Sequence, residues 1–172
     1  MKRTTWLVAV PALAAVCWGS TLAAQKEEEG DQAAVAKAVM SARVSLERGL
    51  AASASHGQPI SAKFELEEGK LQLSVYTAKG GKFFEVVVDH TSGTIVKAEP
   101  ITEGEDLTAA QSQIAAMAKA KRSLRAAMEQ ALRGNAGSRA VSVIPSLKDG
   151  RAVADVTLAK GDEVKTVSVP LQ

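Results

Sequence analysis

The feature that most constrains this chain is an alternation of apolar and polar residues that extends over three consecutive segments. Glycine-containing turns at Glu68-Gly69 and Lys79-Gly80-Gly81 separate the segments. Period-2 alternation is typical of strands that bury one face, so the sequence predicts a three-stranded antiparallel meander. Its apolar positions are Ile60, Ala62, Phe64, Leu66, Leu71, Leu73, Val75, Phe84, Val86 and Val88.

The same alternation returns 81 positions later in the 172-residue chain. A slip of one residue would reverse a whole strand face, so the retained phase indicates an internal duplication. Pro145 takes the place of Phe64 and cannot donate a ladder hydrogen bond, which predicts that its strand lies at a sheet edge. The repeated positions are Val141, Val143, Pro145, Leu147, Ala152, Ala154, Val156, Lys165, Val167 and Val169.

An Ala-rich segment with apolar residues at helical spacing precedes each set of strands. The first segment, residues 31–55, has Asp31 as its expected N-cap. The second, residues 108–133, has a capping box of Thr108 and Gln111 and is expected to stop at Gly134. The apolar faces of the two segments match when equivalent positions are taken 82 residues apart.

The predicted fold is therefore α+β, built from two αβββ units. Each unit is an Ala-rich helix packed on a three-stranded antiparallel meander. The first unit covers residues 31–99, the second covers residues 108–172, and a linker at 100–107 joins them.

The N-terminus has the pattern of a secretory signal peptide. Lys2 and Arg3 precede an apolar run, and small residues follow at positions where cleavage after Ala23 or after Ala24 would fit. We expect a signal peptide at residues 1–24, a flexible acidic segment at 25–30, and a periplasmic or secreted location without membrane attachment after cleavage. A retained single-span anchor is the alternative. The only cysteine, Cys17, follows Val16 rather than a small residue, which argues against lipid attachment.

Charge and residue types exclude several functional classes. The 21 basic and 19 acidic residues nearly cancel, which argues against general nucleic-acid binding. The only histidines are His56 and His90, without ligand-like spacing, and no Gly-x-Ser-x-Gly elbow is present. We therefore expect a protein that is not an enzyme and has no catalytic, cofactor-binding or metal-binding residues.

Residues 84–96 combine an apolar strand, a turn with the pattern Asp-x-x-x-Gly, and a second short apolar strand. Asp89 can accept hydrogen bonds from the turn, and Gly93 can adopt a positive φ. Together with the preceding helix and strands, this order resembles the PepSY domain family over residues 31–98. The second unit departs from the pattern, because Pro170-Leu171-Gln172 stands where the turn would begin.

The PepSY family is associated with propeptides of thermolysin-like metallopeptidases and with extracytoplasmic sensor and accessory proteins. The resemblance implies a binding or regulatory module that modulates or inhibits a secreted peptidase through protein contact, using an edge strand. Because the chain has no His-Glu-x-x-His motif, such an action would be in trans. The alternative is a small-ligand or envelope-stress sensing module that captures a hydrophobic molecule between helix and sheet.

Three residues are candidates for contact with a partner. Tyr76, Phe83 and Val87 are expected on the sheet face opposite the helices. If nothing covers that face, they form an apolar patch open to a partner or to a second copy of the chain. The oligomeric state stays open.

Overall fold

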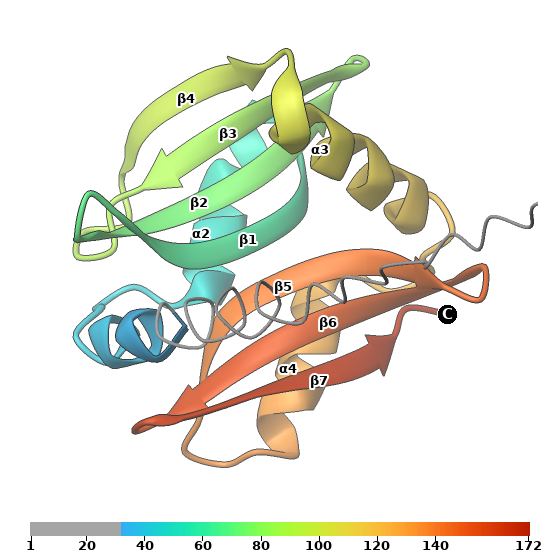
Figure 1. The fold of residues 1–172 in the computed structure, drawn as a ribbon. Coiled ribbons are helices and arrows are strands. Elements are labelled where there is room, and N and C mark those ends of the chain that lie inside the picture. The colour runs from blue at the N-terminus through green and yellow to red at the C-terminus, as the bar shows by residue number, and fades with distance from the viewer. Residues whose placement is uncertain (1–31) are drawn as a thin grey trace, which may run out of the picture.

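A computed structural model describes residues 32–172 and shows an α+β fold built on one antiparallel sheet (Figure 1). The predicted signal peptide, the acidic segment and Asp31 lie outside the described residues. The seven strands follow the order β4-β3-β2-β1-β5-β6-β7. Their bounds are β1 Gln58–Glu67, β2 Lys70–Lys79, β3 Lys82–Val88, β4 Ile95–Ile101, β5 Arg139–Lys148, β6 Arg151–Lys160 and β7 Glu163–Pro170.

The two sets of strands meet in the middle of the sheet, where β1 pairs with β5. Only two register pairs join them, Ala62 with Val143 and Lys63 with Ser142. Ala62 and Val143 are the corresponding positions of the 81-residue repeat, so equivalent residues face each other across the junction. The strand order is symmetric about this junction, except that β4 has no counterpart beyond β7.

The prediction that the strand of Pro145 lies at a sheet edge is wrong, because β5 lies between β1 and β6. Pro145 is nevertheless compatible with this place. It pairs with Ala154 of β6, whereas the ladder between β5 and β1 involves only Ser142 and Val143 on the β5 side. Its missing N–H therefore falls beyond the short β1–β5 ladder.

A β-bulge at the start of β1 changes one predicted face. The register shifts between Pro59 and Ser61, which moves Ile60 into a cluster with Tyr76 on the second face of the sheet. Ala62 and Phe64 remain in the main core, as predicted. The corresponding bulge lies between Ala140 and Ser142 in β5, again 81 positions later.

Each predicted long helix is two helices. Helical residues 32–39 are followed by α2, Leu46–Ser53, with a short 3-10 turn η1 at Ala54–His56. In the second half, α3 spans Gly104–Met117 and α4 spans Leu124–Arg133 with Gly134 as the expected C-cap. The predicted capping box is wrong, since α3 begins four residues before Thr108. Strand β4 ends at Ile101, so most of the predicted linker belongs to β4 and α3.

Backbone hydrogen bonds explain both interruptions. The N–H groups of Arg43 and Val44 donate to the carbonyl of His90, and those of Lys121 and Arg122 donate to the carbonyl of Leu171. These bonds turn the chain away from the helical path, even though the segments are rich in good helix formers.

A serine restarts the helix in each half. Ser45 accepts from the N–H of Arg48, and Ser123 accepts from the N–H of Ala126. The two serines are 78 positions apart, whereas the sequence alignment of the apolar faces uses 82 positions. That alignment is therefore displaced by about one helical turn.

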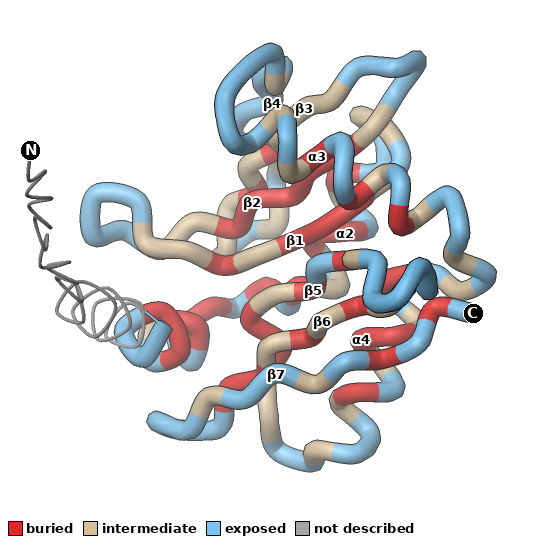
Figure 2. The backbone as a smooth tube through the Cα atoms, turned by 45° about the vertical axis from the view of Figure 1, so that its right-hand side comes forward, coloured by how far each residue is buried: buried red, intermediate tan, exposed pale blue. Residues whose placement is uncertain are grey.

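Helices α2 and α4 lie on the same face of the sheet, next to each other, and α3 packs on the other face (Figures 1 and 2). The main core fills the space under α2 and α4, where Leu46, Leu73, Met128, Val143 and Val156 are almost fully buried. This arrangement leaves β4 and β7 as the two edges of the sheet.

Candidate functional site

The expected apolar patch on the second sheet face is largely covered. Tyr76 is only 6% exposed, because α3 packs over it, and its hydroxyl donates to Asp106 Oδ1 at 2.5 Å. Phe83 packs against the same cluster and is half-buried, and so is Val87. An open patch made by these three residues is therefore not present. Sequence reasoning missed the cover because it treated residues 100–107 as a linker.

The predicted turn signature has the expected geometry. Asp89 Oδ1 accepts from the N–H groups of Thr91 at 2.9 Å and Ser92 at 2.6 Å, and Gly93 has a φ of 79°. These hydrogen bonds hold the pKa of the Asp89 carboxyl below its usual range. The turn also packs on α2, since a Cβ at Gly93 would lie 2.8 Å from Arg48 Nε. Its contacts are internal, so the turn serves the fold.

The two sheet edges differ in how well they are protected against pairing. Edge strands are commonly blocked by charges, prolines and bulges. Strand β4 has all three, because it contains Lys97, Glu99 and Pro100 and pairs with β3 through a bulge between Val87 and Val88. Another chain would find few well-placed donors and acceptors along β4.

Strand β7 is regular, and two of its three protecting residues, Glu163 and Pro170, stand at its ends. It pairs with β6 at every position from Glu163 to Pro170 without a bulge. Between these two terminal residues the sequence Val-Lys-Thr-Val-Ser-Val has one charge, Lys165, and is rich in β-branched residues. The outer side of β7 therefore presents a straight row of backbone groups of the kind that pair with an extended chain.

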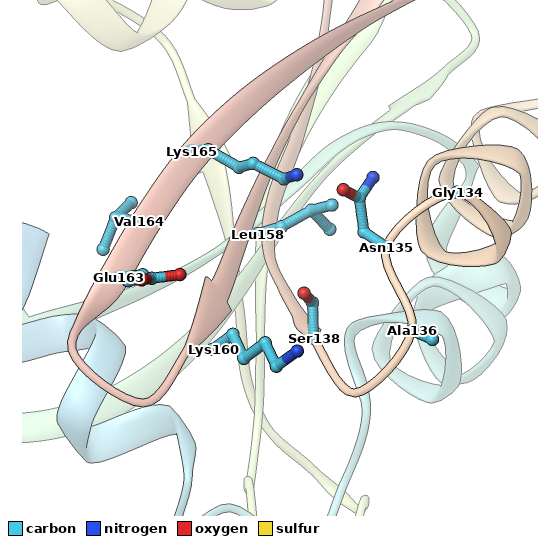
Figure 3. A pocket seen from close by; sticks show the side chains of 9 residues that line it. All are labelled: Gly134, Asn135, Ala136, Ser138, Leu158, Lys160, Glu163, Val164 and Lys165. Atoms are coloured by element: carbon cyan, nitrogen blue, oxygen red, sulfur yellow. The ribbon is translucent and has the colours of Figure 1, made fainter.

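A hollow of about 550 Å³ lies beside the first residues of β7. Leu158 is 1% exposed and lies at its base. Figure 3 shows Lys160 and Lys165 extending from the strands toward Ser138 and Asn135 in the loop that precedes β5. The other lining residues are Gly134, Ala136, Glu163 and Val164.

The hollow has an excess of positive charge. Within the described residues, neither Lys160 nor Lys165 has a carboxylate partner within ion-pair distance. Glu163 is the single acidic residue of the lining, so the formal charge of the lining is +1. A carboxylate entering the hollow would meet two ammonium groups.

The opposite face of β7 is satisfied internally. Lys148 donates to Asp155 Oδ1 at 2.8 Å and to Ser168 Oγ at 2.9 Å, and Ser168 donates to Asp155. Burial acts to raise the pKa of Asp155, but the hydrogen bonds from Lys148 and Ser168 outweigh it and hold that pKa below its usual range. The charges of Lys148 and Asp155 on that face therefore compensate each other.

Sequence reasoning identified these residues only in part. Lys165 was expected at an inward strand position and Lys160 in a turn, but nothing connected either of them with Asn135 or Ser138. The sequence did contain one signal for an unprotected edge strand, because the predicted strand at Val164–Val169 carries a single charge. In residues 32–172, no three His, Cys, Asp or Glu side chains lie close enough to hold a metal ion, and no helix combines the length and apolarity needed to cross a membrane.

Comparisons with known proteins give little further information. No family model matches the chain, and neither does any curated protein. One similar solved structure comes from Clostridium difficile 630, and its name calls it a candidate lipoprotein. That structure has 11% sequence identity and a TM-score of 0.41, over 66% of this chain and 75% of the other.

Proposed function

We propose that this chain is an exported, non-catalytic binding module that takes up an extended segment of a partner protein along β7. The observation that carries the proposal is the regular ladder of β7 from Glu163 to Pro170, with a single charge between its ends and, among residues 32–172, no further strand beyond it. In strand addition, backbone hydrogen bonds supply affinity and pockets beside the strand supply specificity. Export rests on the signal-like sequence of residues 1–24.

The side chains of β7 suggest which segment would fit. Lys165, Val167 and Val169 alternate on the face of β7 that packs toward α4. A partner strand would place alternate side chains beside them. An acidic residue beside Lys165, two positions away from an apolar residue beside Val167, would match both the charge of the hollow and the apolar rim.

We also infer that the chain consists of two related units of the PepSY type. The β1 and β5 bulges, the positive-φ residues Glu68 and Asp149, and the helix-starting serines Ser45 and Ser123 recur in the same order. The Asp89 turn after β3 supports the PepSY resemblance in the first unit. Through that resemblance, a secreted metallopeptidase is the partner class to test first.

The test uses proline substitutions in β7. Adjacent residues of a strand point their N–H groups to opposite sides. Of Thr166→Pro and Val167→Pro, one therefore removes an outward donor and the other removes a bond to β6. The variant that keeps wild-type stability is the one that blocks the edge, and Ala98→Pro in β4 is the matched control. Each is titrated against a purified thermolysin-like metallopeptidase and against two labelled alternating peptides, in which one acidic residue stands two positions after or two positions before an apolar residue.

The proposal predicts saturable binding of peptide, peptidase or both, which the edge-blocking variant loses and the β4 variant keeps. Exchange of the acidic residue for lysine in the peptide should weaken binding about tenfold or less, in line with a partly exposed charge pair. Absence of any complex at high micromolar concentration, or binding that survives in the edge-blocking variant, would overturn the proposal. A dimer of the chain that the same variant abolishes would assign β7 to a second copy instead.

A further inference from the structure

A groove of about 450 Å³ lies on the helix-covered side of the molecule, away from the hollow beside β7. It is bounded by α2, by the start of α4 and by residues 118–123 that connect α3 to α4. Its surface is mainly apolar, and the residues that supply this surface are Leu50, Ala51, Pro59, Met117, Ala120 and Leu124. Small-molecule sites in proteins have this size and this type of lining, with a few polar groups that fix orientation.

The charged groups of this groove are mainly positive. Lys121, Arg122 and Arg125 line it together with a single acidic residue, Glu47. Arg125 is paired with Glu47 at 2.7 Å, and Arg122 bonds only a neutral carbonyl, that of Pro170. Within the described residues, Lys121 has no carboxylate partner. Two positive charges are thus left for a ligand.

A second groove occupies the corresponding place in the other half. It is lined by Arg43, Glu47, Arg139 and apolar residues of α2 and α4, and it measures about 360 Å³. Arg139 donates to the carbonyl of Val44, and the charge that corresponds to Lys121 is Arg43. Both grooves thus offer cations to a ligand, but the second groove is smaller and less apolar, so it provides a control within the same molecule.

We propose that the groove between α2 and α4 binds a single-chain anionic amphiphile, with its acyl chain along Leu50 and Leu124 and its carboxylate at Lys121 and Arg122. Burial of the chain on the apolar surface supplies most of the affinity, since every methylene removed from water adds to the hydrophobic contribution. The cations select the charged head group through charge-assisted hydrogen bonds. This groove shares no lining residue with the hollow beside β7, and its one side-chain link to that strand is the bond from Arg122 to the carbonyl of Pro170 at the strand end.

The test compares ligands of equal chain length on the full-length exported protein. Dodecanoate, dodecanol and dodecyltrimethylammonium are titrated below their aggregation concentrations by calorimetry, and the melting temperature is measured in parallel. We expect dodecanoate to bind saturably and to raise the melting temperature, as a ligand of the native state does. We expect dodecanol to bind about tenfold more weakly and the cationic amphiphile to bind least.

Three variants locate the site. Lys121→Glu should weaken dodecanoate about tenfold or more while leaving dodecanol unchanged, and Ala51→Trp should fill the groove and abolish binding of both. Ala51 and Lys121 are exposed, so both variants should fold. Arg43→Glu, in the counterpart groove, should leave binding unchanged.

Equal binding of dodecanoate and dodecanol would overturn the proposal. So would unchanged binding in Ala51→Trp, or an effect of Arg43→Glu equal to that of Lys121→Glu. Peptide binding by the same Ala51→Trp protein reports separately on β7.

Discussion

Glu47 Oε1 and Arg125 Nη2 lie 2.7 Å apart, and each residue stands two positions after the serine that begins its helix, α2 or α4. Equivalent positions therefore pair with each other between the helices, as Ala62 and Val143 do in the sheet. In a symmetric interface a residue meets its own equivalent only on the twofold axis. An approximate twofold axis that passes through the helix layer and the sheet would place both pairs in contact.

The Glu47–Arg125 pair should contribute little to stability. Arg125 is 62% exposed and also pairs with Glu129 at 2.9 Å, so water and salt screen both contacts. A double-mutant cycle with Glu47→Gln and Arg125→Met, measured by urea unfolding, should give a small coupling free energy that decreases with added salt. A large coupling that salt does not change would contradict this expectation.

The helix-starting serines should matter more than the ion pair. Each supplies a hydrogen bond to the first turn of its helix, and the helices are short, with 8 residues in α2 and 10 in α4. Ser45→Ala and Ser123→Ala should each lower the free energy of unfolding by about 0.5–2 kcal/mol. Ser112→Ala, at an exposed position inside α3, is the control and should have no such cost. If all three variants unfold alike, the serines do not act as caps.

The strand pattern of this chain could be predicted from sequence, and the helix pattern only in part. Alternation located every strand except β4, together with the Glu68-Gly69 turn, because a strand face is set by local period and glycine chemistry. The helix interruptions depend on the carbonyls of His90 and Leu171, which lie far away in the sequence. Local propensity carries no information about such bonds.

The candidate site was less predictable for the same reason. The joining of β1 to β5 turned two separate meanders into one sheet and left only β4 and β7 as edges. That long-range pairing involves Ala62 and Val143, which have no sequence signal beyond their place in the repeat. The loop residues of the hollow depend in turn on where α4 ends relative to β7.

Tyr76 should resist ionisation in the folded protein. Burial of its side chain, together with the hydrogen bond and negative charge of Asp106, raises its pKa well above the ordinary value of about 10. Because the pKa is raised in the folded state, the neutral Tyr76 hydroxyl contributes to the free energy of unfolding. This contribution is complete below about pH 10 and is lost as the pH rises through the folded-state pKa. Tyr76 is the only tyrosine, so tyrosinate absorbance reports on it alone.

We expect tyrosinate absorbance to appear only as the protein unfolds at high pH. Asp106→Asn should allow ionisation at a lower pH, because it removes the negative charge. Tyr76→Phe should lower the free energy of unfolding by about 0.5–1.5 kcal/mol, the net contribution of one hydrogen bond. The loss is no larger because Asp106 is exposed, so water can replace the lost hydroxyl as its partner. Reversible titration near pH 10 in the folded protein would contradict the observed contact.

Asp89 should make the stability of the first half depend on acidity in the opposite sense. Its carboxylate accepts from the N–H groups of Ser92 and Thr91, which lowers its pKa in the folded state. A lowered pKa contributes stability that is present above the ordinary carboxyl value of about 3.9 and is lost as the pH falls through the folded-state value. Asp89→Asn keeps an oxygen acceptor without the charge.

The urea midpoint of the wild type should therefore exceed that of Asp89→Asn at neutral pH, and the difference should close as the pH falls through the lowered folded-state pKa of Asp89. Asp89→Ala has no acceptor and should be less stable than the wild type at both pH values. Asp162→Asn removes an exposed carboxylate from another turn, one without a side-chain hydrogen bond in the described structure, and serves as the control with no difference expected. If the gap between wild type and Asp89→Asn were the same at all pH values, charge-assisted bonding in the turn would not be its cause.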